Sequence, residues 1–191
     1  LADVNHQGVA LETSPYPYVT LEQVLARAGQ RGEAPLLLLL DHLEDPQNVG
    51  TLLRTAEAMA VHGVILPERR SAAITPADCN ASSGAVEHLH IVQVTNVART
   101  QDELKRRNIW IVGLDDRPEA QELLRSDLSG PLALVVGAEG GGLSRLAREQ
   151  CDWRVGIPMS GAIGALKPSG AGSVALGAAR VVSVALLFGL L

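Results

Sequence analysis

Apolar runs alternate with helix-patterned segments along most of this chain. Six runs are short, almost wholly apolar and bounded by polar or turn residues, which is typical of buried strands. These runs are 36–41, 62–67, 89–94, 108–116, 132–137 and 153–159. Helical patterns begin near residue 47 and recur at 101–107, 143–151 and 171–191. The alternation predicts an α/β fold, a parallel sheet with helices on both faces.

The segment DPQNVGTLLRTAEAM (45–59) predicts an amphipathic helix with an arginine off its apolar side. At about 100° per residue, the apolar positions share one arc and Arg54 lies outside it. The apolar positions are Val49, Leu52, Leu53, Ala56 and Ala60. Arg54 therefore faces solvent, a ligand or a partner subunit, and solvent is the ordinary explanation. Asn48, near the start of the same helix, is a candidate N-cap.

The C-terminal stretch, 171–191, is apolar over nearly the length of a membrane span. Arg180 stands at its middle, where membrane insertion would cost about 2.5–3.5 kcal/mol. Its many small residues suit a helix packed closely against protein. We therefore expect a buried or interface helix and no membrane span.

Composition narrows the class of protein. Hydrophobic residues make up 47% of the chain and aromatic residues only 3%, so the core is aliphatic, as in buried parallel sheets. The net charge of −5 provides no bulk attraction to nucleic acid, so RNA would need a local basic patch. Cys79 and Cys151 are isolated, which indicates neither a disulfide framework nor a metal site. We expect a reducing, cytoplasmic location.

Three segments rich in glycine or small polar residues follow predicted strands. They are DHLEDPQNVG (41–50), GAEGGGLS (137–144) and IPMSGAIGALKPSGAG (157–172). Ligands of parallel sheets bind beyond the carboxyl ends of the strands, so we expect the site there. GAEGGGLS lacks the GK[ST] of a P-loop. GAGSVA (170–175) has the GxGxxA spacing of a dinucleotide site, but no strand precedes it, so a nicotinamide dehydrogenase is disfavoured.

Three segments together resemble a known family. NVGTLLRTA (48–56), LVVGAEGGGLS (134–144) and IPMSGAIGAL (157–166) resemble, in order, the three motifs of the SpoU/TrmH class of RNA 2′-O-ribose methyltransferases. SSGAVEHL (82–89) and NHQGVAL (5–11) are also similar, the latter to the linker after an N-terminal RNA-recruiting domain in ribosomal-RNA members. The resemblance divides the chain into a linker, 1–20, and a SpoU-type methyltransferase domain, 21–191, of a longer protein.

The resemblance implies a C-terminal deep trefoil knot, a rare exception to unknotted topology. It also implies S-adenosylmethionine (AdoMet) as cofactor, no metal, and a homodimer acting on RNA, with ribosomal RNA favoured over tRNA. The family's cofactor contacts fall on Leu114, Gly137, Ile157, Met159 and Leu166. Its catalytic positions fall on Asn48, which could also bind RNA, on Arg54 and on Glu139. Ser169 is a further catalytic candidate from this chain.

The third motif departs from the family pattern, which runs on as Ser-Leu-Asn-x-Ser-Val-Ala. A direct alignment places Ala165 at the first serine and Lys167 at the asparagine. An alignment on SVALGAA (173–179) requires an insertion and leaves Ala171 at the asparagine position. Neither register keeps the asparagine, so Ser169 or Ser173 is the candidate substitute.

The leading interpretation is an AdoMet-dependent RNA 2′-O-ribose methyltransferase domain with weak turnover, because its third motif is altered. The alternative is a catalytically impaired RNA-binding or ribosome-assembly protein with the same fold. AdoMet binding separates the leading interpretation from a dehydrogenase-like nucleotide binder, and methyl transfer separates it from the impaired protein.

Overall fold

The computed structural model describes residues 16–68, 74, 76–162, 164, 166–187 and 189. Most of the predicted linker, 1–20, lies outside these residues, as does the segment NHQGVAL. The first helix, α1 (Leu21–Arg31), begins directly after the linker. Thr20 caps it and forms a capping box with Gln23, which satisfies backbone donors that the first turn leaves free.

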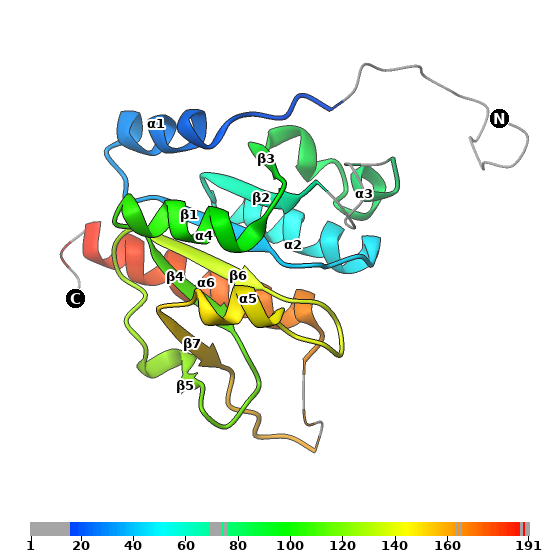
Figure 1. Cartoon of the computed structure of the whole chain (residues 1–191), viewed down its shortest axis with the longest axis vertical. Coiled ribbons are helices and arrows are strands. Elements are labelled where there is room, and N and C mark those ends of the chain that lie inside the picture. Colours follow the sequence, from blue (N-terminus) through cyan, green and yellow to red (C-terminus); the bar gives the residue numbers. More distant parts are fainter. Residues whose placement is uncertain are drawn as a thin grey trace, which may run out of the picture.

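Seven parallel strands form one sheet in the order β3-β2-β1-β6-β4-β7-β5 (Figure 1). The strands are β1 (Leu36–Leu40), β2 (Gly63–Pro67), β3 (Ile91–Val94), β4 (Trp110–Leu114), β5 (Gln121–Glu122), β6 (Leu132–Val136) and β7 (Trp153–Gly156). The other α-helices are α2 (Pro46–Ala58), α3 (Pro76–Ala81), α4 (Val97–Arg106), α5 (Arg145–Glu149) and α6 (Pro168–Leu187). Two short 3-10 helices are η1 (Ala85–His88) and η2 (Leu123–Arg125). The predicted parallel α/β sheet is confirmed.

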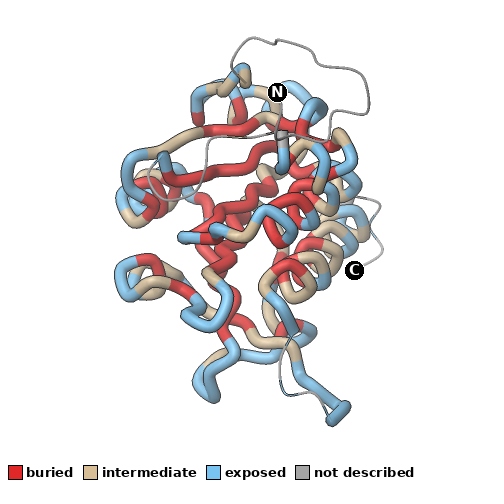
Figure 2. The backbone as a smooth tube through the Cα atoms, turned by 90° about the vertical axis from the view of Figure 1, so that its right-hand side faces the viewer, coloured by how far each residue is buried: buried red, intermediate tan, exposed pale blue. Residues whose placement is uncertain are grey.

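Helices cover both faces of the sheet. α2 and α6 pack on one face, while α1, α4 and α5 pack on the other. Every residue of the central strands β1, β2 and β6 is buried. Figure 2 shows these buried strands running through the middle of the domain. Burial on both faces explains why the strands are continuous apolar runs and not alternating patterns.

Several elements and boundaries differ from the sequence prediction, among them the following three. α1 was not predicted, although its capping box and the spacing of buried Leu21, Val24 and Ala28 are helix signals. β7 ends at Gly156, so the predicted strand 153–159 runs on as a loop. α6 begins at Pro168 and not at Ala171, because proline is favoured at the first helical position, where no backbone donor is needed.

α6 is long and apolar enough to cross a membrane by length and composition alone. Its buried Ala175 and Ala179 belong to the core cluster of the domain. Arg180 donates a hydrogen bond of 3.1 Å to Glu33, which also lies 3.5 Å from the buried His62. The Arg180 bond lowers the pKa of Glu33, and burial lowers the pKa of His62. The arginine in the middle of α6 is therefore paired, as expected of a core or interface helix.

Gly50 lies where α2 packs against the backbone of Ala81 and Ser82. A Cβ on Gly50 would lie 2.6 Å from the carbonyl carbon of Ala81 and 2.9 Å from the amide nitrogen of Ser82. Backbone yields less easily than a side chain, so we expect Gly50→Ala to lower the free energy of unfolding by about 1–3 kcal/mol. Urea denaturation measures this change.

The matched control is Gly29→Ala in α1, where a Cβ meets no atom within 4 Å. Alanine favours helix over glycine by about 0.8–1.0 kcal/mol, so this variant should be as stable as the parent or more so. Equal stability of Gly50→Ala and the parent would contradict the close approach at Ala81.

Candidate active site and cofactor cavity

A cavity of about 750 Å³ opens where β4, β6 and β7 end. All five residues that the family resemblance assigns to a cofactor line it: Leu114, Gly137, Ile157, Met159 and Leu166. The volume lies in the range of small-molecule and cofactor sites, about 300–1,000 Å³. The cavity also lies at the carboxyl edge of the sheet, where the sequence predicted a site.

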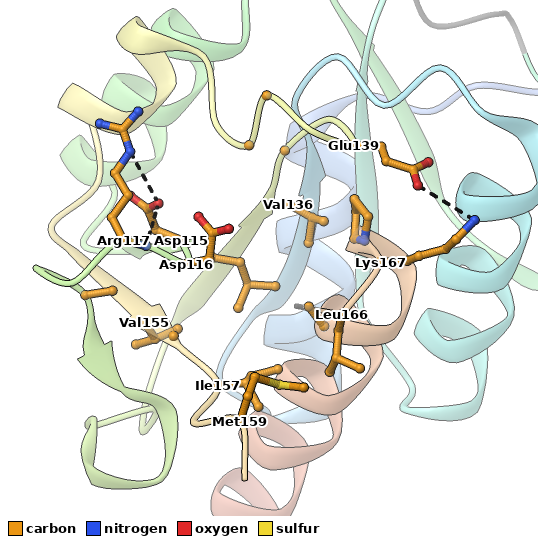
Figure 3. A pocket seen from close by; sticks show the side chains of 18 of the residues that line it. Asp115, Asp116, Arg117, Val136, Glu139, Val155, Ile157, Met159, Leu166 and Lys167 are labelled. Carbon is orange, nitrogen blue, oxygen red and sulfur yellow. Dashed lines mark hydrogen bonds and ion pairs between the residues drawn. The ribbon is translucent and has the colours of Figure 1, made fainter. Parts of the chain in front are cut away.

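The cavity has an apolar middle and charged ends. Figure 3 shows Asp115, Asp116 and Arg117 on one side, with Glu139 and Lys167 on the opposite side. Val136 and Leu166 lie between the two sides, and Val155, Ile157 and Met159 line the lower part of the cavity in this view. This arrangement suits a ligand with a flat or apolar centre and polar ends.

The segment GAEGGGLS forms a tight turn at the edge of the cavity. Ala138 and Gly142 pair through two backbone hydrogen bonds of 3.0 and 2.9 Å. Gly140 and Gly142 have φ of +72° and +62°, the left-handed region that favours glycine. A Cβ on Gly137 would collide with the backbone of Gly142. These glycines therefore serve the turn itself, which brings backbone groups to the cavity and carries Glu139.

Asp115 fixes the opposite wall. Its side chain is only 2% exposed, and its Oδ2 lies 2.9 Å from Arg154 Nη1 and 3.2 Å from Arg148 Nε. These partners come from β7 and α5, so one buried carboxylate joins three elements. Arg117 Nε lies farther away, at 3.9 Å. This cluster was not predicted from the sequence, although an aspartate directly after a buried strand is a signal that could have indicated it.

Asn48 joins the three sequence motifs. Its Nδ2 donates to Asp45 Oδ2 at 2.9 Å and to Glu139 Oε2 at 3.1 Å, and its Oδ1 accepts from Ser169 Oγ at 2.7 Å. The residue is only 2% exposed. We call these hydrogen bonds the Asn48 clasp. The interpretation of Asn48 as N-cap is wrong: the helix is capped by Asp45, whose side chain accepts from the Gln47 amide.

Arg54 lies apart from the clasp. It is exposed, as its helical phase predicted, and its Nη1 donates to Ser83 Oγ at 3.4 Å. On the inner side of α2, Thr55 and Ser173 share a hydrogen bond of 2.8 Å that links α2 to α6. The structure therefore brings Asn48, Glu139 and Ser169 together and leaves Arg54 on the open side of α2.

The start of α6 favours the direct alignment of the third motif. Leu166 lines the cavity and Ser169 contacts Asn48, as a motif next to the cofactor and the catalytic residues requires. Lys167 then stands at the position of the family's asparagine. Its Nζ lies 3.7 Å from Glu139 Oε1. Ser173, the other candidate substitute, contacts Thr55 outside the clasp.

Within the described part of the chain, no group of three or more His, Cys, Asp or Glu side chains could hold a metal ion. Two of the carboxylates at the cavity, those of Asp115 and Glu139, each lie beside a positively charged side chain.

Comparison with known proteins gives the family. A model of the SpoU rRNA Methylase family matches residues 35–177. A Bacillus subtilis protein, YacO, named as a TrmH-family tRNA/rRNA methyltransferase, is 44% identical over 165 residues, which are 86% of this chain and 66% of YacO. The chain thus spans just under two thirds of the length of that relative.

Solved structures show the same fold. The SpoU methyltransferase AviRb from Streptomyces viridochromogenes, solved with the cofactor AdoMet, superposes with a TM-score of 0.77 at 28% identity, covering 88% of this chain and 66% of AviRb. The A. aeolicus TrmH/SpoU tRNA modifying enzyme superposes with a TM-score of 0.72 at 26% identity, covering 88% of this chain and 86% of that enzyme. These similarities imply the C-terminal knot of such folds. This chain belongs to the SpoU rRNA methylase family.

Proposed function

We propose that this chain is the catalytic domain of an AdoMet-dependent RNA 2′-O-ribose methyltransferase, with ribosomal RNA as the favoured acceptor. One observation carries the proposal: the five family cofactor positions line one cavity, and Glu139 at its edge is held by the Asn48 clasp. The division into a linker, 1–20, and a catalytic domain, 21–191, belongs to this proposal. So does a cytoplasmic location, where the RNA is.

The cavity fits AdoMet in size and character. Its apolar middle suits the adenine ring, and the glycine turn lets backbone groups approach a ligand closely. Leu114, Gly137, Ile157, Met159 and Leu166 would hold the cofactor. Bound AdoMet supplies an electrophilic methyl group on a positively charged sulfur. The Glu139 carboxylate at the cavity edge is compatible with that charge.

Asn48 and Ser169 act as positioning residues in this proposal. The cavity lining includes Glu139, whereas both Asn48 and Ser169 are buried behind it and contact each other. Their hydrogen bonds fix the direction of the Glu139 carboxylate. A group held in place before the reaction contributes by alignment, since it need not reorganise when the methyl group is transferred.

Arg54 contacts the RNA in this proposal. An arginine side chain stays protonated in proteins, so it is a poor acceptor for the proton of a ribose hydroxyl. Its planar guanidinium is suited to hold a phosphate and to stabilise negative charge that develops on the 2′ oxygen. Its exposure on α2 leaves it free for that contact.

A second candidate function is an RNA-binding or ribosome-assembly protein without turnover. It is favoured by the altered third motif, in which Lys167 stands at the family's asparagine position. The clasp and the cavity are compatible with both candidates, because AdoMet binding alone does not transfer a methyl group.

A transfer assay with tritiated AdoMet separates the two. The acceptors are ribosomal RNA and tRNA, purified separately from a bacterial strain that lacks the activity. We expect label in ribosomal RNA, in dinucleotides that resist alkaline hydrolysis, because a 2′-O-methyl group removes the nucleophile that cleaves the chain. RNA binding without transfer would support the assembly protein, and label in alkali-labile nucleotides would contradict ribose methylation.

Arg54→Ala tests the RNA contact. We expect methyl transfer to fall by about 100-fold or more, a loss typical of removing one group that stabilises developing charge. The free energy of unfolding should change by less than about 0.5 kcal/mol, since the side chain is exposed. A loss of several kcal/mol in urea denaturation would mean that Arg54 is structural.

Asn48→Ala tests the clasp. Its removal leaves the buried Ser169 hydroxyl and one Glu139 oxygen without their partner, so we expect the free energy of unfolding to fall by about 1–3 kcal/mol. Transfer should fall as well. The control is the exposed neighbour Gln47→Ala, which should match the parent within about 0.5 kcal/mol. Unchanged stability of Asn48→Ala would contradict the clasp.

The homodimer belongs to the same proposal. α6 exposes Val174, Val181, Val184 and Leu186, with Val181 68% exposed. An exposed apolar patch on a long helix indicates that another protein surface packs against it, here that of a second subunit. Light scattering at micromolar concentration should give a dimer, and Val181→Glu should give a monomer. The control Leu146→Glu lies on α5 across the sheet and should stay dimeric, while a monomeric parent would contradict the dimer.

A further inference from the structure

The proposed function leaves Lys167 without a role. Its side chain is 70% exposed and lies at the cavity opposite the Asp115 wall. The distance of 3.7 Å between its Nζ and Glu139 Oε1 is that of a loose ion pair between exposed groups. Such pairs contribute little to stability, so the lysine can leave its partner at small cost.

Glu139 is held more firmly than Lys167. Its second oxygen, Oε2, accepts a hydrogen bond of 3.1 Å from the buried Asn48 amide. Asn48 is in turn bonded to Asp45 and Ser169. The carboxylate is therefore fixed, whereas the ammonium stands on a flexible four-carbon stem and is free to exchange partners.

We propose that Lys167 screens the Glu139 carboxylate in the free protein and passes to a phosphate of the RNA when RNA binds, which leaves Glu139 to face a positively charged cofactor. This inference rests on the proposed function for the identity of both ligands. A phosphate is the favoured occupant because the Lys167 side chain is 70% exposed even while its ammonium lies beside Glu139, so an RNA backbone can reach it from solvent while the cavity holds the cofactor.

The exchange couples the two binding sites. With Lys167 in place, its ammonium offsets the negative charge of the Glu139 carboxylate. Without it, the Glu139 carboxylate attracts AdoMet, whose sulfonium gives it a net positive charge. RNA therefore tightens AdoMet binding, and AdoMet tightens RNA binding by the same factor, because coupling free energies are reciprocal.

The first test measures cofactor binding without RNA. Lys167→Gln removes the screening charge, so AdoMet should bind about threefold tighter than to the parent by calorimetry, in line with the small energies of exposed charge pairs. S-adenosylhomocysteine lacks the sulfonium charge, and its affinity should not change. Lys167→Arg keeps the charge and should behave like the parent.

The second test measures RNA binding with deproteinised bacterial ribosomal RNA. Lys167→Gln should weaken RNA binding. It should also make the plot of log K for RNA against log salt less steep, by about 0.7–0.9 in the magnitude of its slope, which is the value of one phosphate contact. RNA should tighten AdoMet binding to the parent but not to Lys167→Gln. The control is Arg106→Gln, which is 68% exposed and paired with Asp102 on α4, away from the cavity, and should leave AdoMet affinity unchanged.

Tighter AdoMet binding together with weaker RNA binding by Lys167→Gln is the result that the exchange of partners predicts. Weaker AdoMet binding by Lys167→Gln, equal changes for AdoMet and S-adenosylhomocysteine, or an unchanged salt slope would each overturn it. Absence of methyl transfer with the opposite shifts preserved would overturn the proposed function and support this inference.

Discussion

A single buried amide, that of Asn48, holds the candidate site together. Its two N–H bonds go to Asp45 and Glu139, and its oxygen accepts from Ser169. A primary amide is suited to this, because it offers two donors and an acceptor from one end of a short side chain. Since α2, the turn after β6 and the start of α6 meet at this residue, the position of the Glu139 carboxylate depends on it.

The topology of the sheet determines where the site lies. All seven strands run parallel, so the loops after β4, β6 and β7 gather at one edge. The glycine turn lies on one side of the cavity there, and the buried Asp115, paired with Arg148 and Arg154, lies on the other. Both walls are tied to the rigid sheet, which is how a site keeps its shape without a ligand.

Strand-forming runs were predictable because parallel strands buried on both faces are apolar throughout, as in the all-leucine β1. The outward direction of Arg54 was also predictable, since helical periodicity needs no tertiary information. The clasp was not. That Asn48 bonds to Ser169, far away in the chain, follows from how α6 returns across α2. The same return distinguishes the two alignments of the third motif, which local pattern left open.

The cavity between Asp115 and Glu139 is the proposed AdoMet site, and the rest of the proposal depends on that binding. Hydrogen–deuterium exchange with and without AdoMet tests it most directly, because a ligand that binds only the folded state slows local opening around its site. We expect slower exchange of the segments around Leu114, Gly137 and Ile157, with exchange of α1 and α4 unchanged. Binding without protection of these segments, or protection confined to other parts of the domain, would contradict it.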